Sequence, residues 1–143
     1  MDAPQLPLTG FSGPAEDRLA IRELVDAYGD AVARRDADAW IRTWAPQGRW
    51  LIRGAVLAGH AELRRTWLAA MAAYRFVSFQ AQPGAIAVQG SAARMRVHTT
   101  EWLVPLEGPA RLQHGCYEDQ LVREAGRWQF AERSFTVLST QPF

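Results

Sequence analysis

Four side chains of this 143-residue chain are candidates for proton transfer: His98, His114, Asp36 and Tyr28. A histidine has an ordinary pKa of about 6.5, so it can donate or accept a proton near neutral pH. The aspartate could take a proton from a substrate, and the tyrosine hydroxyl could bond to a substrate oxygen. These residue types therefore indicate acid–base chemistry on a small molecule.

The sequence leaves two interpretations open for the first histidine. Alternation along the strand predicted for residues 93–106 puts His98 on one face with Arg94 and Arg96, which is typical of an outward face. The same face carries Thr100 and Trp102, and a bulge in so long a strand would change its direction. His98 is thus either a cavity acid or base, or a surface residue.

The other three candidates also have structural interpretations. His114 shares a strand face with Leu112 and Cys116, so it fits either a pocket or a core position. Asp36 is a natural N-cap for a short helix, and the hydrogen bond of an N-cap weakens a carboxylate as a proton acceptor. Tyr28 lies on the apolar stripe of a helix and needs a partner for its hydroxyl group.

Several large apolar side chains could form the wall of a binding pocket around these groups. They are Trp44, Trp50, Trp67, Met71 and Phe76. Three glutamates are further candidates: Glu101, Glu118 and Glu132. Alternation places Glu132 with Trp128 and Phe130, where the aromatic rings would raise the pKa of its carboxyl group.

The elements that must position these residues can be read from periodicity. Apolar residues at steps of three and four predict a helix over 14–35 and another over 60–74. A short helix is expected from Asp36 to Pro46, with Trp40 and Trp44 on one face. Runs of apolar and β-branched residues, separated by turn signals, predict strands at 48–59, 75–82, 85–89, 93–106, 110–124 and 127–140.

Helices followed by long hairpins predict an α+β fold in which three N-terminal helices pack on a curved antiparallel sheet. Such a sheet can close into a cone with an apolar interior. We expect a flexible arm at residues 1–13 and one domain at 14–143.

Composition argues against several classes of protein. The net charge is +1 and the arginines are scattered, so no nucleic-acid partner is expected. The single cysteine and three histidines have no zinc-site spacing, so no metal is expected. No secretory leader or stretch of about 18 apolar residues is apparent, so we expect a cytoplasmic protein with no membrane partner.

Three segments carry a resemblance to a known family: "AIRELVDAYGDAVARRDADAWIRTWAPQGRW", "GHAELRRTW" and "HGCYEDQLVREAGRWQFAER". Over about residues 15–140 the chain resembles the SnoaL-like branch of the nuclear transport factor 2-like superfamily. The resemblance implies a conical α+β barrel of the nuclear transport factor 2-like or cystatin-like type, with a hydrophobic cavity and a dimeric or trimeric assembly. Relatives include polyketide cyclases, ketosteroid isomerase, scytalone dehydratase and a dehydrochlorinase, most of which use no organic cofactor.

The resemblance also implies roles for particular residues. Asp36 corresponds to the aspartate of the catalytic dyad in some members, and Ser78 stands where those members have a histidine. Tyr117 falls near a polar pocket residue of the dehydratase, and Arg133 falls near a cationic residue of the dehydrochlorinase.

The leading hypothesis is a cofactor-independent isomerase, cyclase or dehydratase that acts on a small apolar cyclic substrate, polyketide, aromatic or steroid-like. Asp36 or a histidine would move the proton, and Tyr28 would hold the substrate oxygen. The alternative is a non-catalytic binding or assembly subunit, like the small subunit of aromatic-ring dioxygenases. Ser78 in place of the usual histidine favours this alternative.

Overall fold

The computed structural model describes residues 7–143 and confirms the α+β class. The three helices and three short strands make up the first half, and four long strands make up the second. In chain order they are β1 (Phe11–Ser12), α1 (Ala15–Arg34), α2 (Ala37–Arg42), β2 (Trp44–Ile52), β3 (Ala55–Ala58), α3 (His60–Ala72), β4 (Tyr74–Gln89), β5 (Ala92–Pro105), β6 (Arg111–Glu124) and β7 (Arg127–Pro142).

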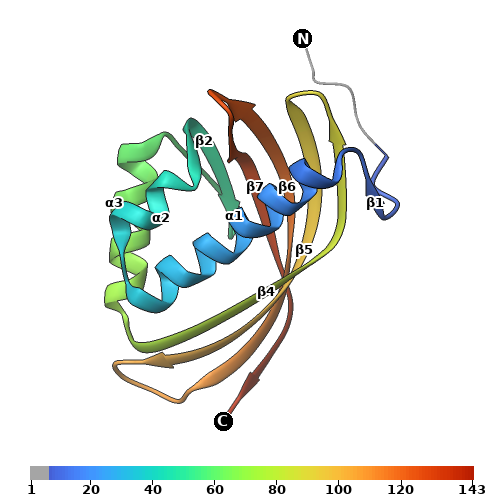
Figure 1. Cartoon of the computed structure of the whole chain (residues 1–143). Coiled ribbons are helices and arrows are strands. Elements are labelled where there is room, and N and C mark those ends of the chain that lie inside the picture. Colours follow the sequence, from blue (N-terminus) through green and yellow to red (C-terminus); the bar gives the residue numbers. More distant parts are fainter. Residues whose placement is uncertain (1–6) are drawn as a thin grey trace.

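All strands belong to one strongly curved sheet, in the order β1-β4-β5-β6-β7-β2-β3. The pairs β4–β5, β5–β6 and β6–β7 are antiparallel, as the hairpin signals predicted, whereas β2 runs parallel to β7. Figure 1 shows α1 crossing the concave side of the sheet, with α2 and α3 stacked beside its C-terminal end. The sheet therefore encloses a space whose other wall is made of helices.

Helix α1 carries Tyr28 into that space. Its first turn contains Glu16 and Asp17, which favour the positive end of the helix dipole. Its buried residues recur at helical spacing: Ile21, Val25, Tyr28, Ala31 and Val32. The helix ends at Arg35, which adopts a left-handed conformation with φ of 54°.

The structure corrects the helical placement of Trp44. Helix α2 ends at Arg42, and Thr43 caps it by donating a hydrogen bond from Oγ1 to the Trp40 carbonyl over 2.7 Å. Trp44 already belongs to β2 and pairs with Phe130. It therefore shares no helix face with Trp40, although their rings still lie 5.7 Å apart.

The turn predicted at Pro83-Gly84 is also wrong. The two strands expected at 75–82 and 85–89 form one strand, β4, whose pairing with β5 shifts between Pro83 and Ala85. A bulge accommodates a proline, which cannot donate a ladder hydrogen bond, without ending the strand. This bend adds to the curvature of the sheet.

Part of the predicted N-terminal arm is ordered on the sheet. Phe11 and Ser12 pair in parallel with Ile86 and Ala87 of β4. Gly13 follows in a left-handed conformation, and a Cβ there would lie 2.6 Å from the Val88 carbonyl oxygen, so the chain packs too closely for a side chain. Residues 1–6 of the arm lie outside the described residues.

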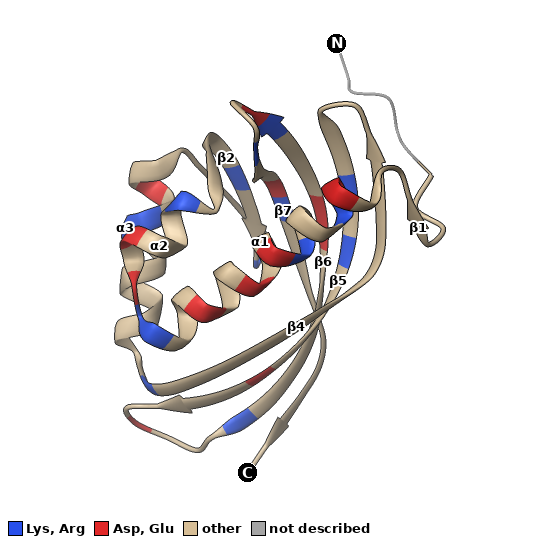
Figure 2. Ribbon diagram, viewed as in Figure 1, with Lys and Arg blue, Asp and Glu red and all other residues tan. Residues whose placement is uncertain are grey.

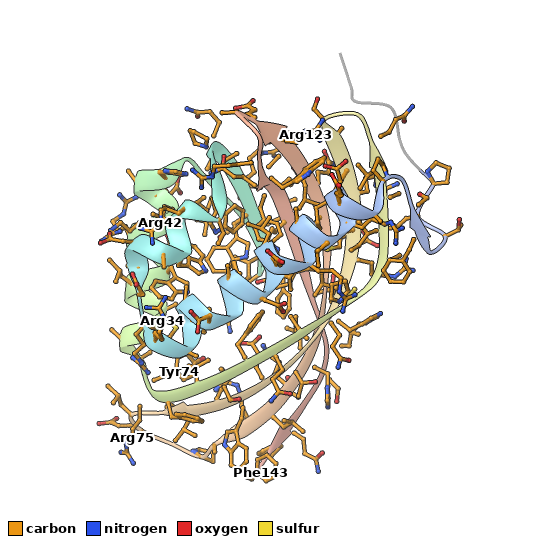
Figure 3. The ribbon with its side chains drawn as sticks, in the orientation of Figure 1. Arg34, Arg42, Tyr74, Arg75, Arg123 and Phe143 are labelled. Atoms are coloured by element: carbon orange, nitrogen blue, oxygen red, sulfur yellow. The ribbon has the colours of Figure 1, made fainter. Side chains whose placement is uncertain are left out.

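The core beside the helices is dominated by tryptophan. Trp40 is fully buried, stacks on Trp67 with a centroid separation of 4.9 Å, and lies 5.7 Å from Trp50. Figure 3 shows side chains filling the volume between the helices and the sheet. Both signs of charge are spread over the ribbon (Figure 2), and no helix among residues 7–143 is long and apolar enough to cross a membrane.

Candidate functional site

A cavity of about 450 Å³ lies between α1, α3 and the concave face of the sheet. Its wall is mostly apolar and includes Trp50, Leu57, Trp67, Met71, Val77 and Leu103. A largely apolar cavity of this size with a few polar groups is typical of a small-molecule site. The predicted pocket positions of Trp50, Trp67 and Met71 agree with this wall.

One carboxyl group lines the cavity. Glu101 of β5 lies directly opposite Gln113 of β6 and accepts a hydrogen bond from its side-chain amide. Burial raises the pKa of Glu101 above its ordinary value, although Gln113 and the charges of Arg111 and Arg53 oppose that shift. A carboxyl group with a raised pKa in an apolar cavity is a strong candidate for a general base.

Two tyrosines face the same cavity and are joined to each other. Tyr28 and Tyr117 are 3% and 4% exposed, and a hydrogen bond joins their side chains. Burial raises the pKa of both phenols, and the charge of Glu101 contributes to the rise. Because each hydroxyl group carries one proton and the bond between them uses only one, the pair can still donate a hydrogen bond to a further acceptor.

A buried ion pair lies behind the tyrosines. Arg133 is fully buried and donates two hydrogen bonds to Asp119, Nε to Oδ1 over 2.8 Å and Nη2 to Oδ2 over 3.1 Å. Burial raises the pKa of the Asp119 carboxyl group, and the guanidinium opposes that rise. Arg133 does not itself line the cavity, so its predicted contact with substrate is replaced by a contact with the tyrosines.

The structure does not bring the histidines to the cavity. His98 and His114 are exposed on the outer face of β5 and β6, where a hydrogen bond of 3.2 Å joins His114 Nδ1 to Thr100 Oγ1. They line a separate pocket of about 350 Å³ with Gln80, Gln82 and Leu138. The prediction that they point into the cavity between the helices and the sheet is wrong, because alternation puts their neighbours Val97, Thr99 and Gln113 on the inner side.

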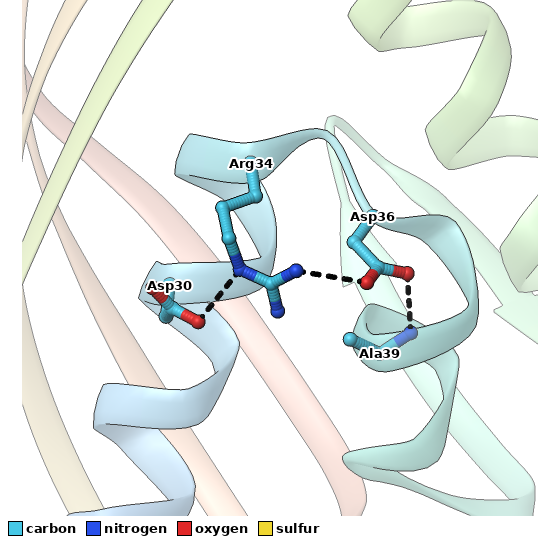
Figure 4. A network of polar contacts seen from close by, with 4 residues as sticks. All are labelled: Asp30, Arg34, Asp36 and Ala39. Carbon is cyan, nitrogen blue, oxygen red and sulfur yellow. Dashed lines mark hydrogen bonds and ion pairs between the residues drawn. The ribbon is translucent and has the colours of Figure 1, made fainter.

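Asp36 is an N-cap rather than a cavity base. Its Oδ1 accepts a hydrogen bond from the Ala39 backbone N–H over 2.9 Å, and its Oδ2 pairs with Arg34 over 3.0 Å (Figure 4). The backbone hydrogen bond, followed by Arg34, lowers the pKa of this carboxyl group. Asp36 does not line the cavity, so its predicted catalytic role is also corrected.

Two predicted wall residues of β4 point away from the cavity. Val77 and Phe79 line it, so the intervening Ser78 and the neighbouring Phe76 belong to the outer face. Phe76 is 54% exposed. The serine that replaces the usual family histidine therefore makes no contact with a ligand in this cavity.

Trp44 and Glu132 are likewise excluded from the cavity wall. Trp44 is fully buried in the core beside Phe130. Glu132 was expected to share a face with Phe130, but the pairing of β6 with β7 shifts at this point, with Gln120 opposite Glu132 and Leu121 opposite Phe130. The extra residue turns Glu132 outward, where Arg49 pairs with it over 2.9 Å.

The sequence carried a usable signal for Glu101, which had only been one of three glutamate candidates. It alternates with Val97, Thr99 and Leu103 on the apolar face of β5, where a charged residue is unexpected. No such signal marked Gln113. Residues 7–143 contain no group of three or more His, Cys, Asp or Glu side chains placed to hold a metal ion.

Gly115 leaves room for an aromatic ring that closes one side of the cavity. A Cβ at this position would overlap Cζ and Cε2 of Phe135, which lines the cavity and lies 4.6 Å from the Tyr117 ring. We expect Gly115→Ala to destabilise the protein by about 1–3 kcal/mol, because the ring must move into the cavity. Urea denaturation measures the change in the free energy of unfolding.

Gly29→Ala is the matched control for this prediction. Its Cβ would make an ordinary contact of 3.6 Å with Phe79, and alanine is the better residue inside α1. We expect Gly29→Ala to be neutral or stabilising. Equal stability of the Gly115→Ala variant and the natural protein would contradict the close packing at Phe135.

Comparisons with known proteins agree with this architecture. The sequence profile of the SnoaL-like domain matches residues 14–134. No curated protein sequence matches the chain. Solved structures similar to the fold include a candidate aromatic ring hydroxylase from Novosphingobium aromaticivorans, with a TM-score of 0.84, 24% identity and coverage of 92% of this chain and 96% of that one.

Two other structures are similar at lower identity. A candidate scytalone dehydratase from Novosphingobium aromaticivorans has a TM-score of 0.82 at 16% identity and covers 90% of this chain and 88% of its own. A hexachlorocyclohexane dehydrochlorinase from Novosphingobium barchaimii has a TM-score of 0.81 at 16% identity and covers 90% of both chains. At these identities the likeness establishes the nuclear transport factor 2-like fold. By the match over residues 14–134, the chain belongs to the SnoaL-like domain family.

Proposed function

We propose that the protein is a cofactor-independent lyase or isomerase that binds a small apolar cyclic molecule in the cavity, with Glu101 as its proton-transferring group. The observation that carries the proposal is a single carboxyl group in an apolar cavity, with its pKa raised by burial and two tyrosine hydroxyls nearby. This assignment replaces the histidines and Asp36 in the scheme expected from sequence.

The proposed step is a proton abstraction. The Glu101 carboxylate removes a proton from a substrate carbon, and the electron pair of that C–H bond forms a new double bond. The displaced electrons move to an oxygen, which takes up negative charge and accepts a hydrogen bond from Tyr28. Protonation elsewhere completes an isomerisation, and loss of a leaving group completes an elimination.

The names of two structural relatives support the lyase class. A dehydratase and a dehydrochlorinase both eliminate a small group, and both share this fold with the present chain. Since one fold hosts many chemistries, the proposal depends on the cavity residues and uses the relatives only as support.

The test uses 5-nitrobenzisoxazole, a small aromatic compound that opens when a base removes one proton. The C–H electrons form a nitrile, the N–O bond breaks, and the coloured product is a phenolate whose charge lies on oxygen. We expect the protein to accelerate the reaction beyond the same concentration of free propionate at equal pH. A rate no higher than that of propionate would overturn the proposal.

A non-catalytic binding subunit is the second candidate. It is favoured by the placement of His98, His114 and Asp36, none of which lines the cavity. In this case small aromatic compounds would quench the fluorescence of Trp50 and Trp67 in the cavity wall, with saturation, and no elimination would occur.

We further propose that the protein is a cytoplasmic homo-oligomer, a dimer or trimer, whose copies meet through the outer face of the sheet. Large apolar side chains on that face are exposed: Phe76, Trp102, Leu138 and Phe143 are 54%, 48%, 61% and 66% accessible. The rings of Trp102 and Phe143 stack at 5.4 Å, and Phe143 lies at the end of the sheet far from α1 (Figure 3). Apolar side chains gathered in this way are typical of a protein interface.

We expect the double variant Phe76→Glu/Trp102→Glu to be monomeric, because two buried unpaired carboxylates would oppose assembly. Size-exclusion chromatography with light scattering measures the mass. Leu19→Glu, an equally apolar and exposed site on α1, is the control and should leave the assembly unchanged. If the double variant keeps the mass of the natural oligomer, the interface lies elsewhere.

A further inference from the structure

The guanidinium of Arg133 is stacked against aromatic rings in the centre of the protein. Its Cζ lies 3.7 Å from the ring centroid of Tyr117, 4.1 Å from that of Phe130 and 4.6 Å from that of Tyr28. The side chain is fully buried, and Asp119 holds it from one side by two hydrogen bonds. Its position is therefore fixed by contacts on several sides.

This arrangement places a permanent positive charge behind the cavity. An arginine in a protein remains protonated, and its planar group stacks on aromatic faces. Asp119 uses Nε and Nη2, while the Nη1 nitrogen is buried without a hydrogen-bond partner. The ion pair therefore leaves part of the cation free to act on the tyrosine rings.

The tyrosines transmit this charge to the cavity. A hydrogen bond joins Tyr117 to Tyr28, and both side chains line the cavity that Arg133 does not reach. A phenol that accepts a hydrogen bond and stacks on a cation is a stronger donor through its own O–H. The strongest bonds of this kind form when the acceptor is negatively charged.

We propose that Arg133, held by Asp119, is a positioning residue that makes the Tyr28–Tyr117 pair an anion-stabilising site, so that the cavity selects substrates that carry or develop a negative charge on oxygen. Enols, phenols and ketones that react through enolates belong to this class. The inference rests on the proposed function in taking this cavity as the substrate site. It adds the chemical class of the substrate and a role for the buried ion pair.

The effect of Arg133 on the pKa values of the two tyrosines agrees with its position against their rings. Burial raises the pKa of Tyr28 and of Tyr117, while the charge of Arg133 lowers it in both cases. Glu101 acts against Arg133 on both phenols. The anion-stabilising effect is thus best measured in the Glu101→Gln protein, which lacks the competing carboxylate.

The test measures binding of 4-nitrophenol, whose ionisation changes its absorbance, by the Glu101→Gln protein. A matched ligand, 4-nitroanisole, has nearly the same shape and cannot ionise. We expect the phenolate to bind about tenfold more tightly than the neutral phenol, equivalent to a fall of about one unit in the pKa of the bound ligand. Tyr28→Phe should remove this preference and leave 4-nitroanisole binding unchanged.

Variants of the ion pair decide the role of Arg133. Replacing both members, as Arg133→Met/Asp119→Leu, substitutes apolar side chains of similar volume, which buried pairs often tolerate. We expect the phenolate preference to fall to about onefold in this protein. Asp119→Asn, which leaves the cation uncompensated, should increase the preference. A purely structural pair would not move the preference in opposite directions.

Several outcomes would overturn the inference. The first is an unchanged phenolate preference in the folded double variant. If only the Asp119→Asn variant folds, a decreased preference in that protein is the second. The third is that neither ligand binds to the Glu101→Gln protein. The binding experiment involves no proton abstraction from carbon, so its result can contradict this inference without contradicting the proposed catalytic function. A phenolate preference without elimination activity would refute only the catalytic proposal, and elimination activity without the preference would refute only this one.

Discussion

Replacing Glu101 by glutamine is expected to reduce the elimination of 5-nitrobenzisoxazole by about a hundredfold or more. Glutamine keeps the shape of the side chain but cannot accept the proton, and positioned general bases contribute about 10²–10⁴-fold. The measurement is kcat/KM from the absorbance of the phenolate product. Binding of 4-nitroanisole should be unaffected, because the wall of the cavity is the same.

The pH dependence of the reaction has a defined direction. Only the Glu101 carboxylate is a base, so activity should be lost as pH falls through the pKa of this group. Burial raises that pKa above its ordinary value of 4.5, against the influence of Gln113, Arg111 and Arg53. Because Tyr28 and Tyr117 also face the cavity and have raised pKa values, they should remain protonated throughout this range.

The raised pKa of Glu101 also predicts that Glu101→Gln stabilises the protein near neutral pH. A carboxyl group whose pKa is higher in the folded state favours folding below the unfolded pKa, and this contribution is lost as pH rises through the folded pKa. The stability advantage of the glutamine variant should therefore grow with pH above about 4.5.

Glu118→Gln is the control for these measurements. Glu118 is exposed on the opposite face of β6, so the same substitution should change neither activity nor its pH profile. Equal activities of the Glu101→Gln variant and the natural protein would show that another group moves the proton.

Trp40→Ala is expected to destabilise the protein by about 3–5 kcal/mol, the largest effect on stability that we predict. Its ring is fully buried and touches those of Tyr28, Trp44, Trp50 and Trp67, so truncation leaves a cavity between the helices and β2. Guanidinium denaturation followed by far-UV circular dichroism measures the loss. Since Trp50 and Trp67 also form part of the cavity wall, binding of 4-nitroanisole should weaken in any protein that still folds.

Trp102→Ala is the control for the tryptophan substitution. Trp102 is 48% exposed on the outer face of the sheet, so its removal should cost much less stability in the monomer. Similar losses for the two substitutions would contradict a special role for the cluster around Trp40.

Local patterns predicted much of this molecule correctly. The three helices, the hairpins of the sheet and the pocket positions of Trp50, Trp67 and Met71 follow from spacing along the chain. These patterns are reliable because side-chain direction repeats every 3.6 residues in a helix and every two in a strand. The inward direction of Tyr28 likewise follows from its place on the apolar stripe of α1.

The candidate acid and base were predicted less well. Alternation in β5 separates His98 from Glu101 onto opposite faces, but it does not say which face is covered by the helices. In β7 the extra residue near Ala131 exchanges the faces, so that Arg133 is buried and the half-buried Glu132 faces outward. A single bulge therefore reversed the face that alternation had assigned to Glu132.

The sequence by itself determined the three helices, the antiparallel hairpins that follow them and the family, since these depend on short-range periodicity and on family motifs within 14–134. Only the tertiary structure decided that Glu101, Tyr28 and Tyr117 meet in one cavity with Arg133 behind them. That meeting depends on strand register and on the packing of α1 across the sheet. Both are set by contacts between residues far apart in the chain, which no local pattern contains.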